Sequence, residues 1–73
     1  MAEVKISLTQ EFLQQVQQQS LAVTVFLLNG VKLQGHILRS DETSLVLQRE
    51  RMRQLVFLHA ISTIMPNEPL ELP

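Results

Sequence analysis

The chain has 73 residues, a formal net charge of −1 and no cysteine, and 45% of its residues are hydrophobic. This length accommodates one domain, and the composition excludes a disulfide framework and a strongly basic chain. A nearly neutral net charge can still conceal a basic face. A chain this short buries only a small core, so its apolar content predicts burial against further copies of itself.

Residues 1–6 are expected to form a flexible N-terminal arm. They lack the basic start and the apolar run of a secretory signal peptide. No apolar run elsewhere approaches the length that crosses a bilayer. We therefore expect a cytoplasmic protein without a membrane partner.

Residues 7–20 are predicted to form a helix. Apolar side chains recur there with the helical period, which predicts one stripe packed against the rest of the chain. The residues of this stripe are Leu8, Phe12, Leu13 and Val16. Ser7 and Gln10 have the spacing of a capping box. Glutamine is a good helix former, and we interpret the glutamines between positions 14 and 19 as a solvated face.

From Leu21 onward the apolar pattern changes to the two-residue period of strands. Asn29-Gly30 is a strong hairpin signal, and we predict a type I′ turn in which both residues have positive φ. Gly35 interrupts the following strand and indicates a sharp bend or bulge. The predicted strands cover about residues 22–29, 31–40, 44–49, 53–58 and 60–64, and residues 67–73 are predicted to be a short, frayed tail.

One helix followed by five short strands predicts a mainly β domain over residues 7–66, built as a small, strongly bent sheet or barrel. No catalytic constellation is visible in it. His36 and His59 make no metal-ligand motif, and there is no cysteine to join them. We expect no enzyme activity, no metal and no cofactor.

A polar surface is the main candidate site in the residues themselves. Amide side chains donate and accept hydrogen bonds at once, as the edge of adenine requires, and aromatic or apolar side chains stack unpaired bases. Such groups stand together in strand contexts at Phe26, Val31, Lys32, Leu33, Gln34 and Gln54. The alternative is that Phe26 and Leu33 are core residues, while Lys32 and Gln34 simply face solvent.

Two segments in order, NG with KLQG at residues 29–35 and HAIST at residues 59–63, resemble the Hfq (host factor) family of bacterial Sm-like RNA chaperones. The resemblance covers about residues 7–66. It implies an Sm fold, in which an N-terminal helix precedes a five-stranded, strongly bent antiparallel sheet. It also implies a homohexameric ring in which the fourth strand of one subunit pairs with the fifth strand of the next. The expected partners are single-stranded small RNAs and mRNAs in post-transcriptional regulation and stress responses.

In this family, A-rich RNA binds the distal face of the ring, away from the helices. The resemblance assigns that role to Phe26, Gly30, Val31, Lys32, Leu33, Gln34, Gln54 and Thr63. Phe26 would stack a base, Gln54 would bond an adenine edge and Lys32 would contact phosphate or sugar. Repetition of Lys32 around a ring would create a basic circle that the net charge of one chain conceals.

The proximal face of the family reads uridine at the pore, and this chain departs from that pattern. Leu58 stands at the lysine position directly before His59, and Thr9 stands at the glutamine position near the helix start. The loop aromatic corresponds to Thr43 or Ser44, and only His59 is retained. A site built for hydrogen bonds loses about 1–3 kcal/mol for each buried partner left unpaired. We therefore expect weak uridine binding.

The rim departs as well, because residues 17–20 are Gln-Gln-Gln-Ser where some members carry an arginine patch. We expect poor annealing of two RNAs. Arg49, Arg51 and Arg53 surround the turn between the third and fourth strands. They form either a solvated hairpin paired locally with Glu50 or an auxiliary phosphate contact.

Two hypotheses of function follow. The first is an RNA-binding ring of the Hfq type that works by equilibrium binding. The second is an Sm-fold oligomerisation module with little RNA affinity, a divergent copy that mixes into the rings of a fuller paralogue.

Overall fold

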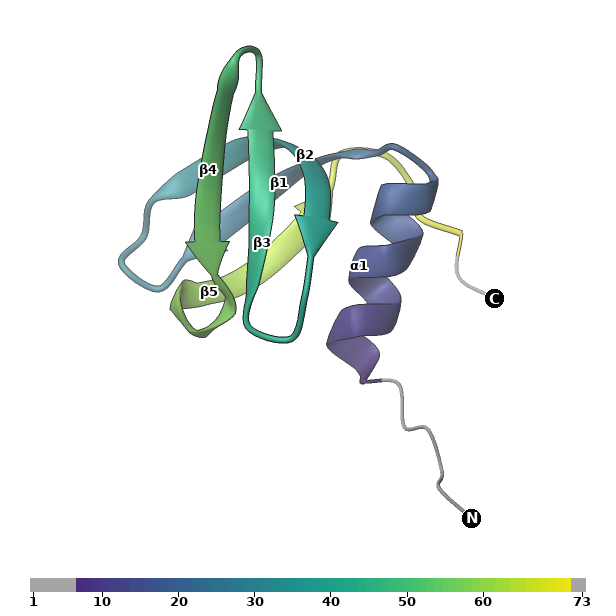
Figure 1. Cartoon of the computed structure of the whole chain (residues 1–73), viewed down its shortest axis with the longest axis horizontal. Helices are drawn as coiled ribbons and strands as arrows, with labels where there is room; N and C mark the ends of the chain where they lie inside the picture. Colours follow the sequence, from purple (N-terminus) through teal and green to yellow (C-terminus); the bar gives the residue numbers. More distant parts are fainter. Residues whose placement is uncertain (1–6, 72–73) are drawn as a thin grey trace.

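A computed structural model describes residues 7–71 of the protein as one helix packed against a five-stranded antiparallel sheet (Figure 1). The expected N-terminal arm, residues 1–6, lies outside the described residues. The elements are α1 (Leu8–Gln18), β1 (Ala22–Leu27), β2 (Lys32–Ser40), β3 (Ser44–Arg49), β4 (Met52–Phe57), the 3-10 turn η1 (Leu58–Ala60) and β5 (Ile61–Pro66). No described helix is long and apolar enough to cross a membrane.

Local signals set both ends of α1. The Ser7 hydroxyl accepts a hydrogen bond from the backbone N–H of Gln10 at 3.0 Å, which caps the first turn. At the other end the backbone N–H groups of Ser20 and Leu21 bond back into the helix, in the pattern of a Schellman motif. Ser20 takes the left-handed conformation that this motif requires, with φ of 53°.

The apolar stripe of α1 is buried in part. Leu13 and Val16 are inaccessible to solvent and Phe12 is half-buried. Leu8, predicted as part of the same stripe, is 79% exposed in the single chain, so that prediction is wrong for its position. Leu8 is the first residue of α1, more than one helical turn before Leu13, the first buried residue of the helix.

The strands form one sheet in the order β4-β3-β2-β1-β5, and every neighbouring pair is antiparallel. β2 is shared between two partners: its first half pairs with β1 and its second half pairs with β3. Figure 1 shows the result, a β3–β4 hairpin that stands at an angle to the β1–β2 pair. β4 and β5 are the two edges of this strongly bent sheet.

The bend depends on Gly35 and on a register shift between Ile37 and Arg39. A Cβ at Gly35 would overlap the carbonyl oxygen of Gln48 and lie 2.9 Å from its carbonyl carbon. Only glycine lets β3 approach β2 so closely at this point. The bend expected at Gly35 is therefore present, and its physical reason is close approach of two backbones.

The turn between β1 and β2 differs from the predicted type I′ turn. Gly30 has φ of +90°, but Asn29 is not among the residues with positive φ. The N–H of Gly30 bonds to the carbonyl of Leu27, and the Asn29 side chain accepts from the N–H of Val31. This is the longer hairpin loop in which an ordinary turn is followed by a left-handed glycine. The loop takes up residues 28–31, so β1 ends at Leu27 and β2 begins at Lys32.

The concave side of the bent sheet holds the core, and α1 closes it. The fully buried side chains are Leu13, Val16, Val23, Val25, Leu45 and Leu47. Gln17 was expected on a solvated face, yet its side-chain amide donates to the Ser40 hydroxyl at 2.7 Å and to the Leu13 carbonyl at 3.2 Å. This glutamine ties α1 to the end of β2, so the solvated interpretation is wrong for it.

The segment after β5 is also held in place. The Asn67 N–H bonds to the Ala22 carbonyl, and the Asn67 side chain accepts from the buried Thr24 hydroxyl at 3.0 Å. Leu70 packs against the core, and the Gln19 amide donates to the Glu71 carbonyl at 2.9 Å. The prediction of a frayed tail is therefore wrong for residues 67–71.

Candidate nucleic-acid interface

Four of the predicted site residues share one exposed side of the sheet. In register, Phe26 of β1 faces Lys32 of β2 and Thr63 of β5, and the neighbouring pair is Thr24 with Gln34. Facing residues of antiparallel strands point to the same side of a sheet, and alternate residues of one strand do so too. We call this side, which is opposite to the buried core, the outer face; its first members are Phe26, Lys32, Gln34 and Thr63.

Lys32 and Phe26 form a contact pair on the outer face. The ammonium nitrogen of Lys32 lies 5.6 Å from the centroid of the Phe26 ring, within the range of a cation–π interaction. The ring is half-buried and the lysine is exposed, so the aromatic surface and the charge are both within reach of a ligand. A flat aromatic surface beside a positive charge is the arrangement that binds an unpaired base and its phosphate.

The other residues predicted for the distal face occupy different places. Gly30 and Val31 lie in the exposed β1–β2 loop, next to Lys32. Leu33 is half-buried and packs against the core, on the opposite side of β2 from Gln34. Gln54 faces Leu47 in register, which puts it on the core side of β4. A single chain thus brings Phe26, Lys32, Gln34 and Thr63 together but does not bring Gln54 to them.

The charges of the described residues are segregated by element, a feature that the net charge concealed. None of the five strands within residues 7–71 contains a carboxylate. The acidic residues described lie in α1, in loops, in the β3–β4 turn and after β5, at Glu11, Asp41, Glu42, Glu50, Glu68 and Glu71. The cationic and imidazole side chains of the strands are Lys32, His36, Arg39, Arg49 and Arg53. The sheet is therefore a positive surface in a chain whose total charge is slightly negative.

This segregation could have been found in the sequence by counting charges strand by strand. No predicted strand contains Asp or Glu, and the acidic residues fall in residues 1–6, in the helix, in the connections at 41–43 and 50–52, and in the tail. The signal was diluted because the total over 73 residues is −1. For binding to a polyanion, the charge of the contacting face matters more than the total.

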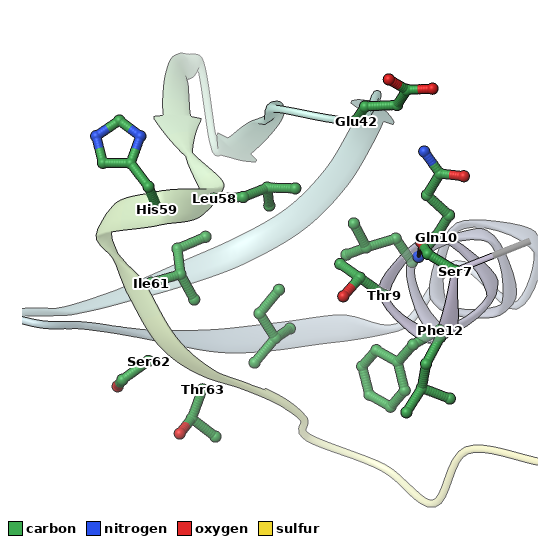
Figure 2. Close-up of a pocket in the computed structure, with 13 residues that line it drawn as sticks. Ser7, Thr9, Gln10, Phe12, Glu42, Leu58, His59, Ile61, Ser62 and Thr63 are labelled. Atoms are coloured by element: carbon green, nitrogen blue, oxygen red, sulfur yellow. Dashed lines mark hydrogen bonds between the residues drawn. The ribbon is translucent and has the colours of Figure 1, made fainter.

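Three of the four residues predicted for the proximal pore meet at a groove between α1 and the start of β5, with a volume of about 1010 Å³ (Figure 2). Thr9, Leu58 and His59 line it, together with Phe12 and Ile61. Figure 2 shows Leu58 and Ile61 directed toward the helix and His59 at the far end of the groove from it. The His59 ring stacks on Phe57, with centroids 5.7 Å apart and an interplanar angle of 21°.

Thr43 does not line this groove. Its hydroxyl and backbone N–H both donate to one carboxylate oxygen of Asp41, at 3.2 and 2.9 Å, and Ser44 makes the same pair of bonds. The backbone hydrogen bonds from Thr43 and Ser44 hold the pKa of the Asp41 carboxyl below its ordinary value. The Thr43 carbonyl accepts from the N–H of Leu58 at 2.9 Å, so this turn positions η1 rather than offering its own hydroxyl groups.

The three arginines of the β3–β4 hairpin do not share a face. Arg53 faces Gln48 in register, on the outer face, whereas Arg49 faces Met52 on the core side of the hairpin. Arg51 lies in the turn beside Glu50. Within one chain, only Arg53 of the three is on the same face as Lys32.

Comparison with known proteins agrees with this architecture. The family model described as "Hfq protein" matches residues 8–71. The chain belongs to the Hfq family. The RNA-binding protein Hfq of Cereibacter sphaeroides is 49% identical over 72 residues, which cover 99% of this chain and 94% of the relative. The RNA-binding protein Hfq of Sinorhizobium fredii is 46% identical over 72 residues, with coverage of 99% and 90%.

A crystal structure of the pleiotropic translational regulator, Hfq, superposes with a TM-score of 0.77 and 30% sequence identity. The superposition covers 81% of this chain and 98% of the other. The Sm fold of Hfq proteins, one helix followed by a bent five-stranded antiparallel sheet, is thus confirmed for this chain. The region that matches the Hfq family contains the outer face and, apart from Ser7, the residues that line the groove of Figure 2.

Proposed function

We propose that this protein is an Hfq-type RNA chaperone that binds single-stranded, A-rich RNA on the outer face of a ring of copies. It acts in the cytoplasm, in post-transcriptional regulation by small RNAs and mRNAs. The chemistry is equilibrium binding without catalysis. The observation that carries the proposal is the pair of Lys32 and Phe26 on a sheet whose described strands contain no carboxylate. Relatives at 49% and 46% identity that are named RNA-binding proteins support it.

The Lys32–Phe26 pair explains how a base can be bound without rebuilding the surface. An exposed cation–π contact contributes about 0.5–1 kcal/mol, whereas stacking of a base on an aromatic side chain contributes about 1–3 kcal/mol. A base therefore displaces the Lys32 ammonium group from the Phe26 ring. The displaced ammonium remains beside the base, where it meets the phosphate or sugar. Gln34, on the same face, supplies an amide for the base edge.

A ring of copies is supported by the edges of the sheet. β4 and β5 are both edge strands, and edges that stay exposed invite pairing with another chain. On β4, Leu55 and Phe57 share one side of the strand and are 58% and 50% exposed, and Met52 on the other side is 68% exposed. Exposed large apolar side chains along an edge strand mark an interaction surface. We propose that β4 of one copy pairs with β5 of the next in a homohexamer. In such a pair, Gln54 on β4 of one copy would lie next to β5 of the neighbouring copy, which carries Thr63. It would thereby complete the adenine site.

On the other side of the ring we propose weak uridine binding. The groove of Figure 2 has His59 at one end, but Leu58 and Ile61 line its middle, and the Thr43 hydroxyl is engaged by Asp41. Leu58 and Ile61 offer no hydrogen-bond donor, so the polar atoms of a uracil edge that lay against them would be buried unpaired. We also propose poor RNA annealing at the rim, since Gln17 bonds to Ser40 and the helix end carries no arginine.

A second candidate is an oligomerisation module with little RNA affinity, which could mix with subunits of a paralogue. The exposed apolar side chains of β4 and the apolar groove fit assembly as well as they fit an RNA-binding ring. The two functions share the fold and differ only in RNA affinity. Binding measurements therefore separate them.

The test is fluorescence anisotropy of the purified protein with labelled oligo-A and oligo-U at physiological salt. We expect tighter binding of oligo-A than of oligo-U. Phe26→Ala and Lys32→Ala should each weaken oligo-A binding by about tenfold, the order expected for loss of one base stack or one charge-assisted bond. Arg49→Ala is the matched control, because it removes one charge from the core side of the sheet. Failure to bind either RNA would support the oligomerisation module, and tight oligo-U binding would contradict the assignment of the groove.

A further inference from the structure

The outer face continues beyond the proposed adenine site, across β3 and β4. His36 of β2 faces Gln48 of β3, and Gln48 faces Arg53 of β4. Since facing residues point to the same side of an antiparallel sheet, these three side chains form one row across three strands. We call it the polar row. It spans two inter-strand gaps, about 10 Å in total.

The polar row is continuous with the Lys32–Phe26 site. Lys32, Gln34 and His36 alternate along β2, and each faces a residue of β1 on the outer face. Alternate residues of a strand are about 6.6 Å apart, so the row begins one such step beyond Gln34. The close approach of β2 and β3 at Gly35 fixes His36 and Gln48 beside each other at the bend.

The groups of the polar row are available for binding. His36 and Arg53 are exposed. Gln48 is half-buried, and its amide nitrogen donates to the Glu50 carbonyl at 3.0 Å, which holds the side chain in one orientation and leaves its oxygen to accept. An arginine offers five N–H donors and an imidazole offers a donor and a flat ring. These are the groups that contact phosphate oxygens, sugar hydroxyls and unpaired bases.

The electrostatic surroundings favour an anionic ligand along this row. The charged side chains that share the outer face of the described strands are Lys32, Arg39 and Arg53, all cationic. The closest carboxylate in sequence, Glu50, belongs to the turn beyond β3. Repetition of such a row around a ring would multiply its field.

We propose that the polar row His36–Gln48–Arg53 is a second contact for single-stranded RNA, which binds the backbone of a strand that continues past the Lys32–Phe26 site. The inference rests on the proposed function and extends it. A short oligonucleotide fills the adenine site alone, whereas a longer strand also follows the row to the β3–β4 hairpin. The occupant is RNA rather than an acidic protein, because the row is contiguous with a base-stacking site.

The test compares a short oligo-A of about six nucleotides with one of about eighteen, each measured by anisotropy over a series of salt concentrations. The variant is the double substitution His36→Ala and Arg53→Ala. It should leave the affinity for the short strand within about twofold of the unchanged protein and weaken the long strand by about tenfold. The slope of log K against log salt for the long strand should become shallower by about 0.7 for each phosphate that the variant no longer neutralises.

Matched variants make the outcome decisive. Arg49→Ala removes the same charge from the other side of the hairpin and should not change the length dependence. Arg53→Gln keeps much of the side chain and should still weaken the long strand, which separates charge from packing. Gel filtration verifies that each variant assembles like the unchanged protein.

Several results would overturn the inference. Equal long-strand binding by the double variant and the unchanged protein would show that the row does not touch RNA; if Lys32→Ala still weakens both strands, the proposed function survives. If the double variant weakened binding of the short and the long strand equally, the row would be part of the adenine site and not a second contact. If Arg49→Ala weakened long-strand binding as much as Arg53→Gln does, the loss would come from a lower total charge and not from a contact of the polar row with RNA. Binding of neither strand by the unchanged protein would reject the inference and the proposed function together.

Discussion

The most informative perturbation of the fold is Gly35→Ala, because its cost can be worked out from neighbouring atoms. The new Cβ would overlap the Gln48 carbonyl oxygen and lie 2.9 Å from the carbonyl carbon. Both are backbone atoms of a paired strand, so neither can rotate away. Overpacking of this kind costs about 1–3 kcal/mol, and loss of one adjacent ladder hydrogen bond would add about 0.5–1.5 kcal/mol. We expect a destabilisation of about 1.5–4.5 kcal/mol from these two terms together.

The matched substitution is Gly30→Ala, which meets nothing within 4 Å but must adopt φ of +90°. Placing an L-residue in left-handed backbone costs about 1–2 kcal/mol, partly offset by about 0.4–1 kcal/mol because alanine restricts the unfolded chain. Gly30→Ala should therefore cost less than Gly35→Ala. Both glycines have positive φ, +90° at Gly30 and +158° at Gly35, so the difference between the two variants reports mainly the steric clash at Gly35.

Urea unfolding followed by circular dichroism measures both free energies, with the slope m compared between variants. Protein concentration must be held constant, because assembly of copies contributes to the apparent stability. If Gly35→Ala were no more destabilising than Gly30→Ala, the close approach of β2 and β3 could not be the reason for the glycine. The account of how the bend is built would then be wrong.

Three further changes test the capping, the Asp41 turn and the groove. Ser20→Gly should stabilise the protein by about 0.5–1 kcal/mol in urea unfolding, since Ser20 holds a left-handed φ of 53°; no gain would mean that the motif tolerates serine without strain. Asp41 has a pKa below its ordinary value of 3.8, so the stability that its charge adds is present above 3.8 and is lost as pH falls through the lowered pKa. The stability difference between the unchanged protein and Asp41→Asn should therefore be constant near neutral pH and shrink below 3.8, and a difference that grows in acid would reverse this reasoning. Leu58→Lys should strengthen oligo-U binding by about tenfold or more by adding a charged donor to the groove, and His59→Ala should abolish that gain; an unchanged affinity would show that Leu58 is not what weakens the site.

Much of this molecule can be predicted from the order of its residues. The helix start at Ser7, the change to strand periodicity after Leu21 and the bend at Gly35 follow from local rules of capping, period and backbone freedom. The Hfq family can be predicted too, since the segments NG, KLQG and HAIST carry it. These features depend on near neighbours in the chain, which is why sequence alone determines them.

Other features depended on contacts that sequence spacing does not carry. The frayed tail was a wrong prediction because Asn67 and Leu70 are held by Thr24 and by the core, which are distant in the chain. Gln17 was expected in solvent for the same reason, since its partner Ser40 lies on another element. The prediction of a type I′ turn was wrong because Asn29-Gly30 also fits a longer loop. In that loop residues 28–31 connect the strands, and of the two residues only Gly30 has a positive φ.

For the candidate site, the sequence by itself determined which residue types are present and which are missing. Phe26, Lys32, Gln34 and His59 were identified from their order, and so was the replacement at Leu58. Only the tertiary structure decided which of them share a face. Register sends Gln34 and Arg53 to the outer face and Gln54 and Arg49 to the core side, because a shift of one residue along a strand reverses the direction of a side chain. Pairing partners, not sequence distance, set that register, and so they decide where a strand of RNA would meet the sheet.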